Sequence, residues 1–174
     1  MIWKWGDGTA NTVIDEPQLD GLNVGNSSHN YTDYGSYTIE QVIYNLTTGC
    51  GDSTTKNIDI SLVEPIFSLS NDSVCAGDSL QMLDASLTWD QPPSPHPLAS
   101  WSFDMGNGDV INNGPEVGYA YANPGTYDIT LTATNSVNCA ASAVLPISVL
   151  ANPFAVIAPD NTVGCSPFLV NFSN

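Results

Sequence analysis

The chain has 174 residues, 42% of them hydrophobic, so it can form packed cores in one large domain or two small ones. Two Lys, no Arg and 18 acidic residues give a formal net charge of -16. This charge excludes nucleic acid as a partner and disfavours anionic membranes, because both require a basic protein surface. Abundant Thr, Ser, Asn, Gly and Pro, without helix-forming runs, predict an all-β protein.

The first predicted strand covers residues 1–5, where Met and Trp side chains alternate with other residues and share a face. A tight Gly-Asp-Gly turn follows at 6–8. The next strand, at 37–43, has an apolar face that Gln41 interrupts, which predicts a β-bulge or an edge position. No signal peptide or membrane-length apolar run occurs, so we expect any export signal or anchor outside this stretch.

The same features return further along the chain. A proline-containing connector at 62–65 is expected to restrict a hinge and discourage edge pairing. Aromatic and Met side chains share a face over 101–105, and a Gly-Asn-Gly turn follows at 106–108. Strict alternation over 127–134 predicts a half-buried strand, and a second connector is predicted at 150–153. Short strands separated by such turns favour a β-sandwich.

Three motifs recur at nearly constant spacing, which indicates internal repeats. The motif at 3–8 returns 100 residues later. His-x-Tyr at 29–31 and Gly-Ser-Tyr-Thr-Ile at 35–39 each have a counterpart 90 residues later. The difference is a loop, which covers 9–28 in the first copy and the shorter stretch 109–118 in the second.

A third, partial copy is predicted at the end of the sequence. Cys75 and Cys165 lie 90 residues apart, and an apolar alternation begins five residues after each of them. The sequence therefore predicts three pieces. They are a repeat without its first two strands (1–63), a complete repeat (64–150) and the first two strands of a third repeat (151–174).

Two interpretations of these boundaries remain open. The stretch is either a window of a longer repeat array or a subunit that polymerises. In the second case, the tail of one subunit would complete the incomplete sandwich at the head of the next, as in donor-strand assembly.

The recurring motifs resemble those of the polycystic-kidney-disease (PKD) family of Ig-like repeats. The resemblance implies tandem β-sandwiches, each with seven strands in two sheets, and export to the cell surface. The chain is also similar to the repeats of giant adhesins from gliding, type-IX-secreting bacteria. The motif residues that carry the resemblance, and to which it assigns structural roles, are Trp3, Trp5, Gly6, Asp7, Gly8, His29, Tyr31, Gly35, Tyr37, Phe103, Gly106, Gly108, Tyr121, Gly125 and Tyr127.

No catalytic or metal site is expected. Nucleophilic catalysis needs a base beside the nucleophile, and the two histidines, His29 and His96, are better explained as structural. Trp3 and Trp5 are expected in the core, although an exposed pair would suit sugar stacking. No cofactor is expected, and surface Ca²⁺ is the alternative explanation of the acidity, without a dense acidic loop to support it.

The four cysteines are predicted to form disulfides in an oxidising compartment. Cys50 and Cys139 fall in the turn between the last two strands of a repeat, whereas Cys75 and Cys165 precede the second strand. In an Ig-like topology, the early cysteine of one repeat faces the last-turn cysteine of the following repeat. We therefore expect inter-repeat disulfides, with free buried thiols as the alternative.

Three Asp-Ser sites, at Ser53, Ser73 and Ser79, resemble the O-glycosylation motif of gliding, type-IX-secreting bacteria. The sequence as a whole predicts a non-catalytic spacer: a stalk or fibre segment of a secreted cell-surface adhesin or filament. Its partners would be neighbouring repeats, identical subunits, or a surface polysaccharide or protein. The alternative is a carbohydrate- or protein-binding accessory module of a secreted hydrolase.

Overall fold

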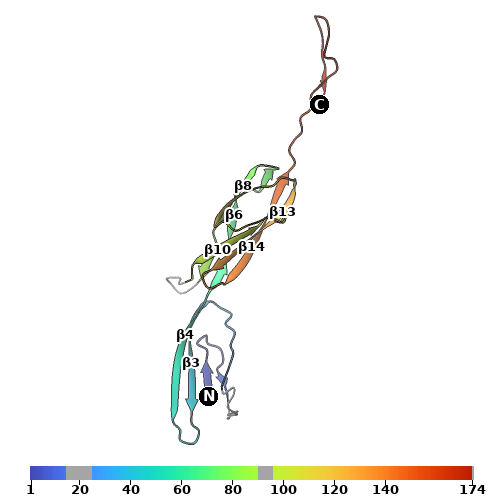
Figure 1. Cartoon of the computed structure of the whole chain (residues 1–174). Helices are drawn as coiled ribbons and strands as arrows, with labels where there is room; N and C mark the ends of the chain where they lie inside the picture. Colours follow the sequence, from blue (N-terminus) through green and yellow to red (C-terminus); the bar gives the residue numbers. More distant parts are fainter. Residues whose placement is uncertain (15–24, 90–95, 174) are drawn as a thin grey trace.

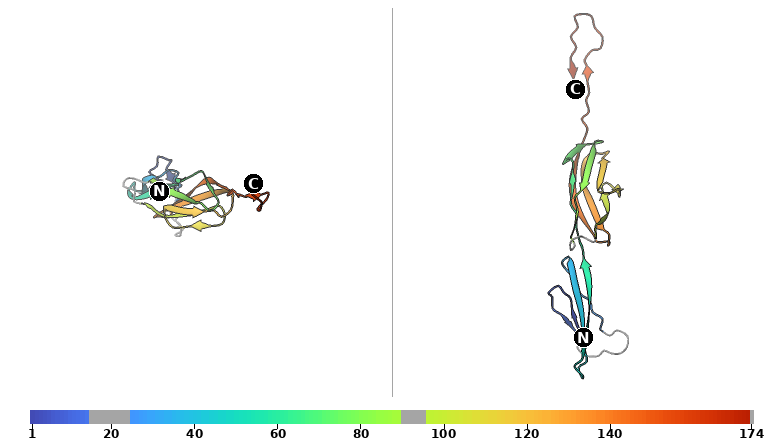
Figure 2. Two further views of the ribbon diagram at one scale, coloured as in Figure 1. Left: turned by 90° about the horizontal axis from the view of Figure 1, so that it is seen from above. Right: turned by 90° about the vertical axis from the view of Figure 1, so that its left-hand side faces the viewer.

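The computed structural model describes residues 1–14, 25–89 and 96–173, and every regular element within these ranges is a β-strand. The strands form an N-terminal unit, a central sandwich and a C-terminal hairpin, which lie end to end (Figures 1 and 2). No helix in the described ranges is long and apolar enough to cross a membrane. Half of the long loop of the first copy (15–24 of 9–28) and part of the proline-rich loop at 92–97 lie outside the described residues.

The N-terminal unit is one sheet with the strand order β2-β1-β3-β4. Its main feature is a long antiparallel hairpin in which β3 pairs with β4 along its whole length. None of the described residues forms a second sheet over its face. The strands are β1 (Ile2–Lys4), β2 (Thr12–Val13), β3 (Gly35–Tyr44) and β4 (Gly51–Ile60).

The position of Gln41 differs from the predicted β-bulge or edge strand. It lies in β3, which pairs with β1 on one side and with β4 on the other, without a shift in register on either side. It is therefore neither at a bulge nor on an edge strand. Its side chain is half-buried and donates a hydrogen bond to Met1 Sδ at 3.3 Å. A polar side chain is tolerated because this face of the sheet is only partly covered.

The connector after β4 is also different from the prediction. Residues 62–64 form β5 (Leu62–Glu64), which pairs antiparallel with β9 (Leu87–Trp89). The expectation that proline would discourage pairing here is wrong, because Pro65 follows the strand and lacks an N–H only at its own position. Val63 is buried, with 3% of its surface exposed. The connector is thus bonded to the central sandwich.

The central unit is a two-layer β-sandwich, which confirms the all-β, Ig-like fold class. A five-stranded sheet (β11-β10-β13-β14-β7) faces a three-stranded sheet (β12-β8-β6), so the short β11 adds one strand to the seven expected. The strands of this unit are β6 (Phe67–Leu69), β7 (Ser73–Cys75), β8 (Ser79–Asp84), β10 (Leu98–Asp104), β11 (Val110–Ile111), β12 (Glu116–Ala120), β13 (Gly125–Asn135) and β14 (Ala140–Leu150).

The core of the sandwich follows from alternation. In β13, Ile129, Leu131 and Ala133 point inward and have no exposed surface. Leu80 and Met82 of β8, in the opposite sheet, are equally buried and belong to the same core cluster as Ile129 and Leu131. Burial of each Ile, Leu or Met side chain in this core contributes about 1.5–3 kcal/mol. This central unit has the best-formed core in the described chain.

The C-terminal segment is a small hairpin of β15 (Ala158–Pro159) and β16 (Phe172–Ser173). It projects beyond the sandwich (Figure 1). Large apolar side chains of the segment lie open to solvent, among them Phe154, Val163, Leu169 and Phe172. The segment therefore presents apolar side chains that no other described part of the chain covers.

Candidate functional site: a recurring aromatic cluster

The predicted motif residues of the central unit form one cluster at the end of β10. Gly106 turns the chain with φ +73°, and a Cβ there would lie 2.6 Å from the Asp128 carbonyl oxygen. This distance is far below a van der Waals contact, so only glycine allows β10 to leave the sheet so close to β13. Gly108, in the same turn, has φ +100° and no atom within 4 Å of a built Cβ.

Tyr121 is the centre of this cluster. Its side chain is 1% exposed, and its hydroxyl donates a hydrogen bond to the Met105 carbonyl at 2.9 Å. Its ring stacks on Tyr127, with centroids 4.3 Å apart, and the Tyr127 hydroxyl donates to the Asn123 carbonyl at 3.0 Å. Burial raises the pKa of Tyr121 to about 12, because the phenolate would lose its hydration. The cluster thus pins the turn to the main sheet.

The N-terminal unit contains the same contacts. Tyr31 donates to the Trp5 carbonyl at 2.8 Å and stacks on Tyr37 with centroids 4.5 Å apart. The Tyr37 hydroxyl donates to the Asp33 carbonyl at 3.0 Å. A Cβ on Gly6 would lie 2.6 Å from the Thr38 carbonyl oxygen, the same close approach as at Gly106. The motif residues therefore make matching contacts in both units.

The two clusters differ in their polar rim. In the N-terminal unit, His29 Nε2 lies 2.6 Å from Asp7 Oδ2, and the Thr9 hydroxyl donates to Asp7 Oδ1 at 2.6 Å. The hydrogen bonds from Thr9 and then from His29 lower the pKa of Asp7 to about 2. In the central unit, Tyr119 takes the histidine position and donates to Asp109, which raises the pKa of Tyr119.

The Asp7–His29 pair lacks the geometry of a catalytic relay. In a relay, the carboxylate and the nucleophile bind opposite ring nitrogens of the histidine. Here the carboxylate and the Thr9 hydroxyl, at 3.5 Å, both approach Nε2. The His29 ring also stacks flat on Trp5 at 4.7 Å. This arrangement orients the histidine within the cluster.

Comparison with known proteins identifies the central unit. Residues 68–147 match the family model described as PKD domain. The central unit is a PKD domain. Human polycystin-1 is 24% identical to the chain over 146 residues, which are 82% of this chain and only 3% of polycystin-1.

Three solved structures with similar folds each cover about half of this chain. The PKD1 domain of Vibrio anguillarum Epp is 22% identical, with 52% of this chain and 95% of that chain covered and a TM-score of 0.42. The PKD1 domain of the Vibrio cholerae metalloprotease PrtV is 24% identical, with 49% and 93% covered and a TM-score of 0.39. A structure of carbohydrate-binding modules from the β-sandwich superfamily is 23% identical, with 51% and 34% covered and a TM-score of 0.45.

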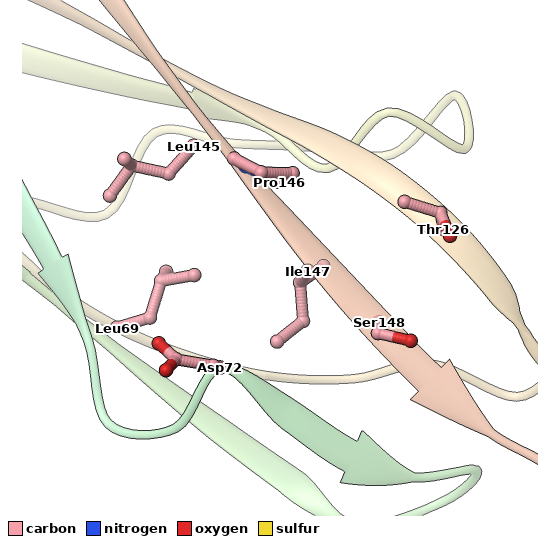
Figure 3. Close-up of a pocket in the computed structure, with 7 residues that line it drawn as sticks. All are labelled: Leu69, Asp72, Thr126, Leu145, Pro146, Ile147 and Ser148. Atoms are coloured by element: carbon pink, nitrogen blue, oxygen red, sulfur yellow. The ribbon is translucent and has the colours of Figure 1, made fainter.

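A shallow pocket of the PKD domain lies beside β14 and is lined by side chains from both sheets (Figure 3). Leu69 and Ile147 form its apolar wall, and the Asp72 carboxylate and the Ser148 hydroxyl are the polar groups at its side. Within 1–14, 25–89 and 96–173, no three His, Cys, Asp or Glu side chains are grouped so that they could hold a metal ion.

The four tryptophans, of which only Trp3 and Trp5 were considered for sugar stacking, differ in exposure. Trp5 is buried, and Trp3 stacks on it at 5.8 Å while its Nε1 donates to the Gly25 carbonyl. Trp101 is half-buried and donates to Asp84 at 2.8 Å. The sequence did not single out Trp89, which is 40% exposed and lies 5.9 Å from the Tyr34 ring. Of the tryptophans, Trp89 therefore presents the most accessible ring to solvent.

The four cysteines are free thiols at the ends of the units. Cys139 lies in the β13–β14 turn, and Cys75 pairs with Leu150 at the other end of β14. The two thiols of the PKD domain are thus separated by the length of β14, 11 residues or about 36 Å. Cys50 lies in the β3–β4 turn and Cys165 between β15 and β16. Ser53, Ser73 and Ser79, the predicted glycosylation sites, are all exposed.

Proposed function

We propose that this chain is a segment of an array of PKD-type repeats and acts as a non-catalytic spacer, a stalk or fibre segment, in a secreted cell-surface adhesin or filament. On this proposal, 1–63 and 151–174 belong to the preceding and following repeats. Partners are neighbouring repeats or identical subunits. The gliding, type-IX-secreting context is part of this proposal.

The observation that carries the proposal is the recurrence of one set of contacts in two units. Tyr31 and Tyr121 make the same hydrogen bond to a main-chain carbonyl and the same ring stack. Gly6 and Gly106 make the same close approach to the neighbouring strand. Contacts that recur in such detail between two units are typical of copies of one structural unit.

The junction between the first two units supports a spacer role. β5 pairs with β9, so the connector cannot swing freely. Asn135 Nδ2 donates to the Ser61 hydroxyl at 2.6 Å and bonds the first unit's exit to the β13–β14 turn. Asn135 is 1% exposed, so this contact is shielded from water. A paired, shielded junction holds successive units in line, as an extended stalk requires.

Small-angle X-ray scattering tests the stiff junction. Val63→Asp places a charge in the buried position of β5, whereas Leu62→Asp changes the adjacent, 47% exposed position and serves as the control. We expect an extended scattering profile from the unmodified chain and from Leu62→Asp. Val63→Asp should give a broadened distance distribution. The spacer proposal is wrong if the unmodified chain already scatters as units on a free hinge.

An accessory module that binds carbohydrate or protein is the second candidate function, and one surface favours it. Trp89 and Tyr34 are exposed by 40% and 45%, with ring centroids 5.9 Å apart, and aromatic faces of this kind stack on sugar rings. Titration calorimetry against plant and bacterial-surface oligosaccharides tests it. Binding that Trp89→Ala abolishes, and that Trp101→Ala retains, would favour the module over the spacer.

A further inference from the structure

The junction between the first unit and the PKD domain carries an exposed apolar surface on the short ribbon of β5 and β9. In this ribbon, Leu62 lies opposite Trp89 and Glu64 lies opposite Leu87. Paired residues share a face, and alternation along β5 places these two pairs on one face and Val63 on the other. Val63 is buried, so the face with the two pairs points to solvent. Leu62 and Leu87 are accordingly exposed, by 47% and 45%.

Two aromatic rings from different units form the centre of this surface. Tyr34 belongs to the first unit and Trp89 to β9, and their ring centroids lie 5.9 Å apart with an angle of 37° between the ring planes. The two residues keep 45% and 40% of their surface exposed. The rings of Tyr34 and Trp89 therefore form one open aromatic surface across the junction, the junction platform.

The recurring motif does not account for these two rings. Neither Tyr34 nor Trp89 is one of the motif residues. Tyr34 directly precedes Gly35, whereas Pro124 stands at the same place before Gly125. The PKD domain thus folds without an aromatic ring at this position. The exposed ring of Tyr34 is therefore not a requirement of the fold, and binding a ligand is an alternative explanation for it.

Glu64 places a carboxylate at the edge of the junction platform. Its Oε2 accepts a hydrogen bond from Trp89 Nε1 at 2.8 Å, and the residue is exposed. Both lysines of the chain lie elsewhere, because Lys4 pairs with Glu40 at 2.9 Å and Lys56 lies within β4. Among the described residues, no ion pair includes Glu64. The position beside its carboxylate is therefore left to a cation from outside the chain.

The platform and its carboxylate together fit a positively charged group. An aromatic face attracts a cation that lies within about 6 Å of the ring centroid, and Trp gives the strongest contact of this kind. The Glu64 carboxylate, bonded to the edge of the Trp89 ring, attracts the same cation. The net charge of -16 adds a long-range attraction for cations and disfavours acidic polysaccharides.

The size of the platform favours a sugar over a single ammonium group. One ammonium group interacts with the face of one ring, whereas two neighbouring exposed rings offer a wider apolar surface. The C–H groups of a sugar ring pack on such a surface, and its hydroxyl groups stay in water. Successive sugars of a glycan therefore fit the two rings, and an amine on one of them fits Glu64.

We propose that the junction platform binds a glycan of amino sugars. Its sugar rings stack on Trp89 and Tyr34, and a protonated amine lies between the Trp89 ring and the Glu64 carboxylate. The inference rests on the accessory-module function proposed above and names the ligand class of that same surface. The two rings belong to different units, so a glycan that contacts both also holds the junction in line. Binding and the stiffness of the junction are coupled, and each strengthens the other.

Titration calorimetry with three oligomers of equal length tests the ligand class. The first is a β-1,4-linked glucosamine oligomer, in mildly acidic buffer that keeps its amines protonated. The second is the matching glucose oligomer, with a neutral hydroxyl in place of each amine, and the third is an oligolysine without sugar rings. We expect the glucosamine oligomer to bind about tenfold more tightly than the other two. Its preference over glucose should shrink as the Debye length falls from about 10 Å to about 3 Å in high salt.

Two carboxylate variants test the role of Glu64. Glu64→Gln removes the charge but retains the shape and an oxygen that accepts the Trp89 Nε1–H bond. We expect it to lose the preference for glucosamine and to bind the glucose oligomer as before. Asp78→Asn is the control, because it removes the same charge from the exposed turn between β7 and β8, at the other end of the PKD domain. A preference that Glu64→Gln retains, or that Asp78→Asn loses equally, would overturn the assignment of the amine to Glu64.

Two tyrosine variants test whether the glycan bridges the units. Tyr34 and Tyr44 are both exposed, by 45% and 57%, but Tyr44 ends β3, about 30 Å along the strand from the junction. Tyr34→Ala should weaken binding of both sugar oligomers about tenfold, and Tyr44→Ala should leave it unchanged. The bound glucosamine oligomer should also slow amide hydrogen exchange in β5 and β9 of the unmodified chain. Unchanged binding by Tyr34→Ala would overturn the bridge.

The outcomes separate this inference from the accessory-module function. Equal binding of the glucosamine and glucose oligomers by the unmodified chain overturns the amine site and leaves a module for neutral sugars. Equal binding of oligolysine and the glucosamine oligomer overturns the glycan and indicates a basic protein as the partner. Binding of none of the three overturns both the inference and the accessory-module function.

Discussion

Removal of the tyrosine hydroxyl should destabilise the more deeply buried of the two aromatic clusters by a larger amount. In Tyr121→Phe, the Met105 carbonyl loses its hydrogen bond at a site that is 1% exposed, and water cannot easily replace the donor. A buried polar group left without this partner costs about 1–3 kcal/mol. For a domain of this size, about 2 kcal/mol corresponds to a decrease in Tm of about 8–16 °C.

The first unit provides the matched control. Tyr31 makes the same bond, to the Trp5 carbonyl, but its side chain is only half-buried, so water can reach the freed acceptor. We expect Tyr31→Phe to cost about 0.5–1.5 kcal/mol. Urea titrations followed by amide NMR signals report the unfolding free energy of each unit separately. A cost for Tyr121→Phe no larger than that for Tyr31→Phe would refute the argument that burial sets the strength of this bond.

Two other changes test the motif turns. Gly106→Ala should destabilise the PKD domain by about 2 kcal/mol or more in thermal unfolding, because the added Cβ would lie 2.6 Å from the Asp128 carbonyl oxygen. Gly108→Ala should cost only about 1 kcal/mol, because no atom lies within 4 Å of a Cβ added there. Asp7→Asn should remove the stabilisation that the ionised Asp7 carboxylate gives to the N-terminal unit. The pKa of Asp7 is lowered to about 2, so its contribution is complete above pH 3.8 and is lost as the pH falls toward 2. Identical acid-unfolding profiles with and without Asp7 would contradict this assignment.

The sequence predicted the PKD domain well where burial follows alternation. The pattern over 127–134 became β13, with Ile129 and Leu131 fully buried, because one face of a strand must turn inward when a second sheet covers it. The motif tyrosines were predicted to have structural roles. Their hydrogen-bond partners could not be predicted, because Tyr121 donates to a main-chain carbonyl, which every residue has.

The junction and Gln41 show why other features could not be predicted. β5 pairs with β9, which lies well beyond it along the chain, and nothing in the local sequence of 62–65 specifies that partner. Gln41 breaks an apolar pattern, and such a break indicates a bulge or an edge only where the face is fully covered. Its tolerance depends on what covers the sheet, and this is a property of the tertiary structure.

The pairing of β7 with β14 has a consequence for a chain under tension. The chain enters the PKD domain near Phe67 and leaves it after Leu150, at opposite ends of the sandwich. β7 runs parallel to the last residues of β14, with Ser73 opposite Ser148 and Cys75 opposite Leu150. Tension between entry and exit therefore shears these hydrogen bonds, and they must break together instead of opening one by one. A domain with this connectivity should rupture abruptly at high force and remain extended and folded below it.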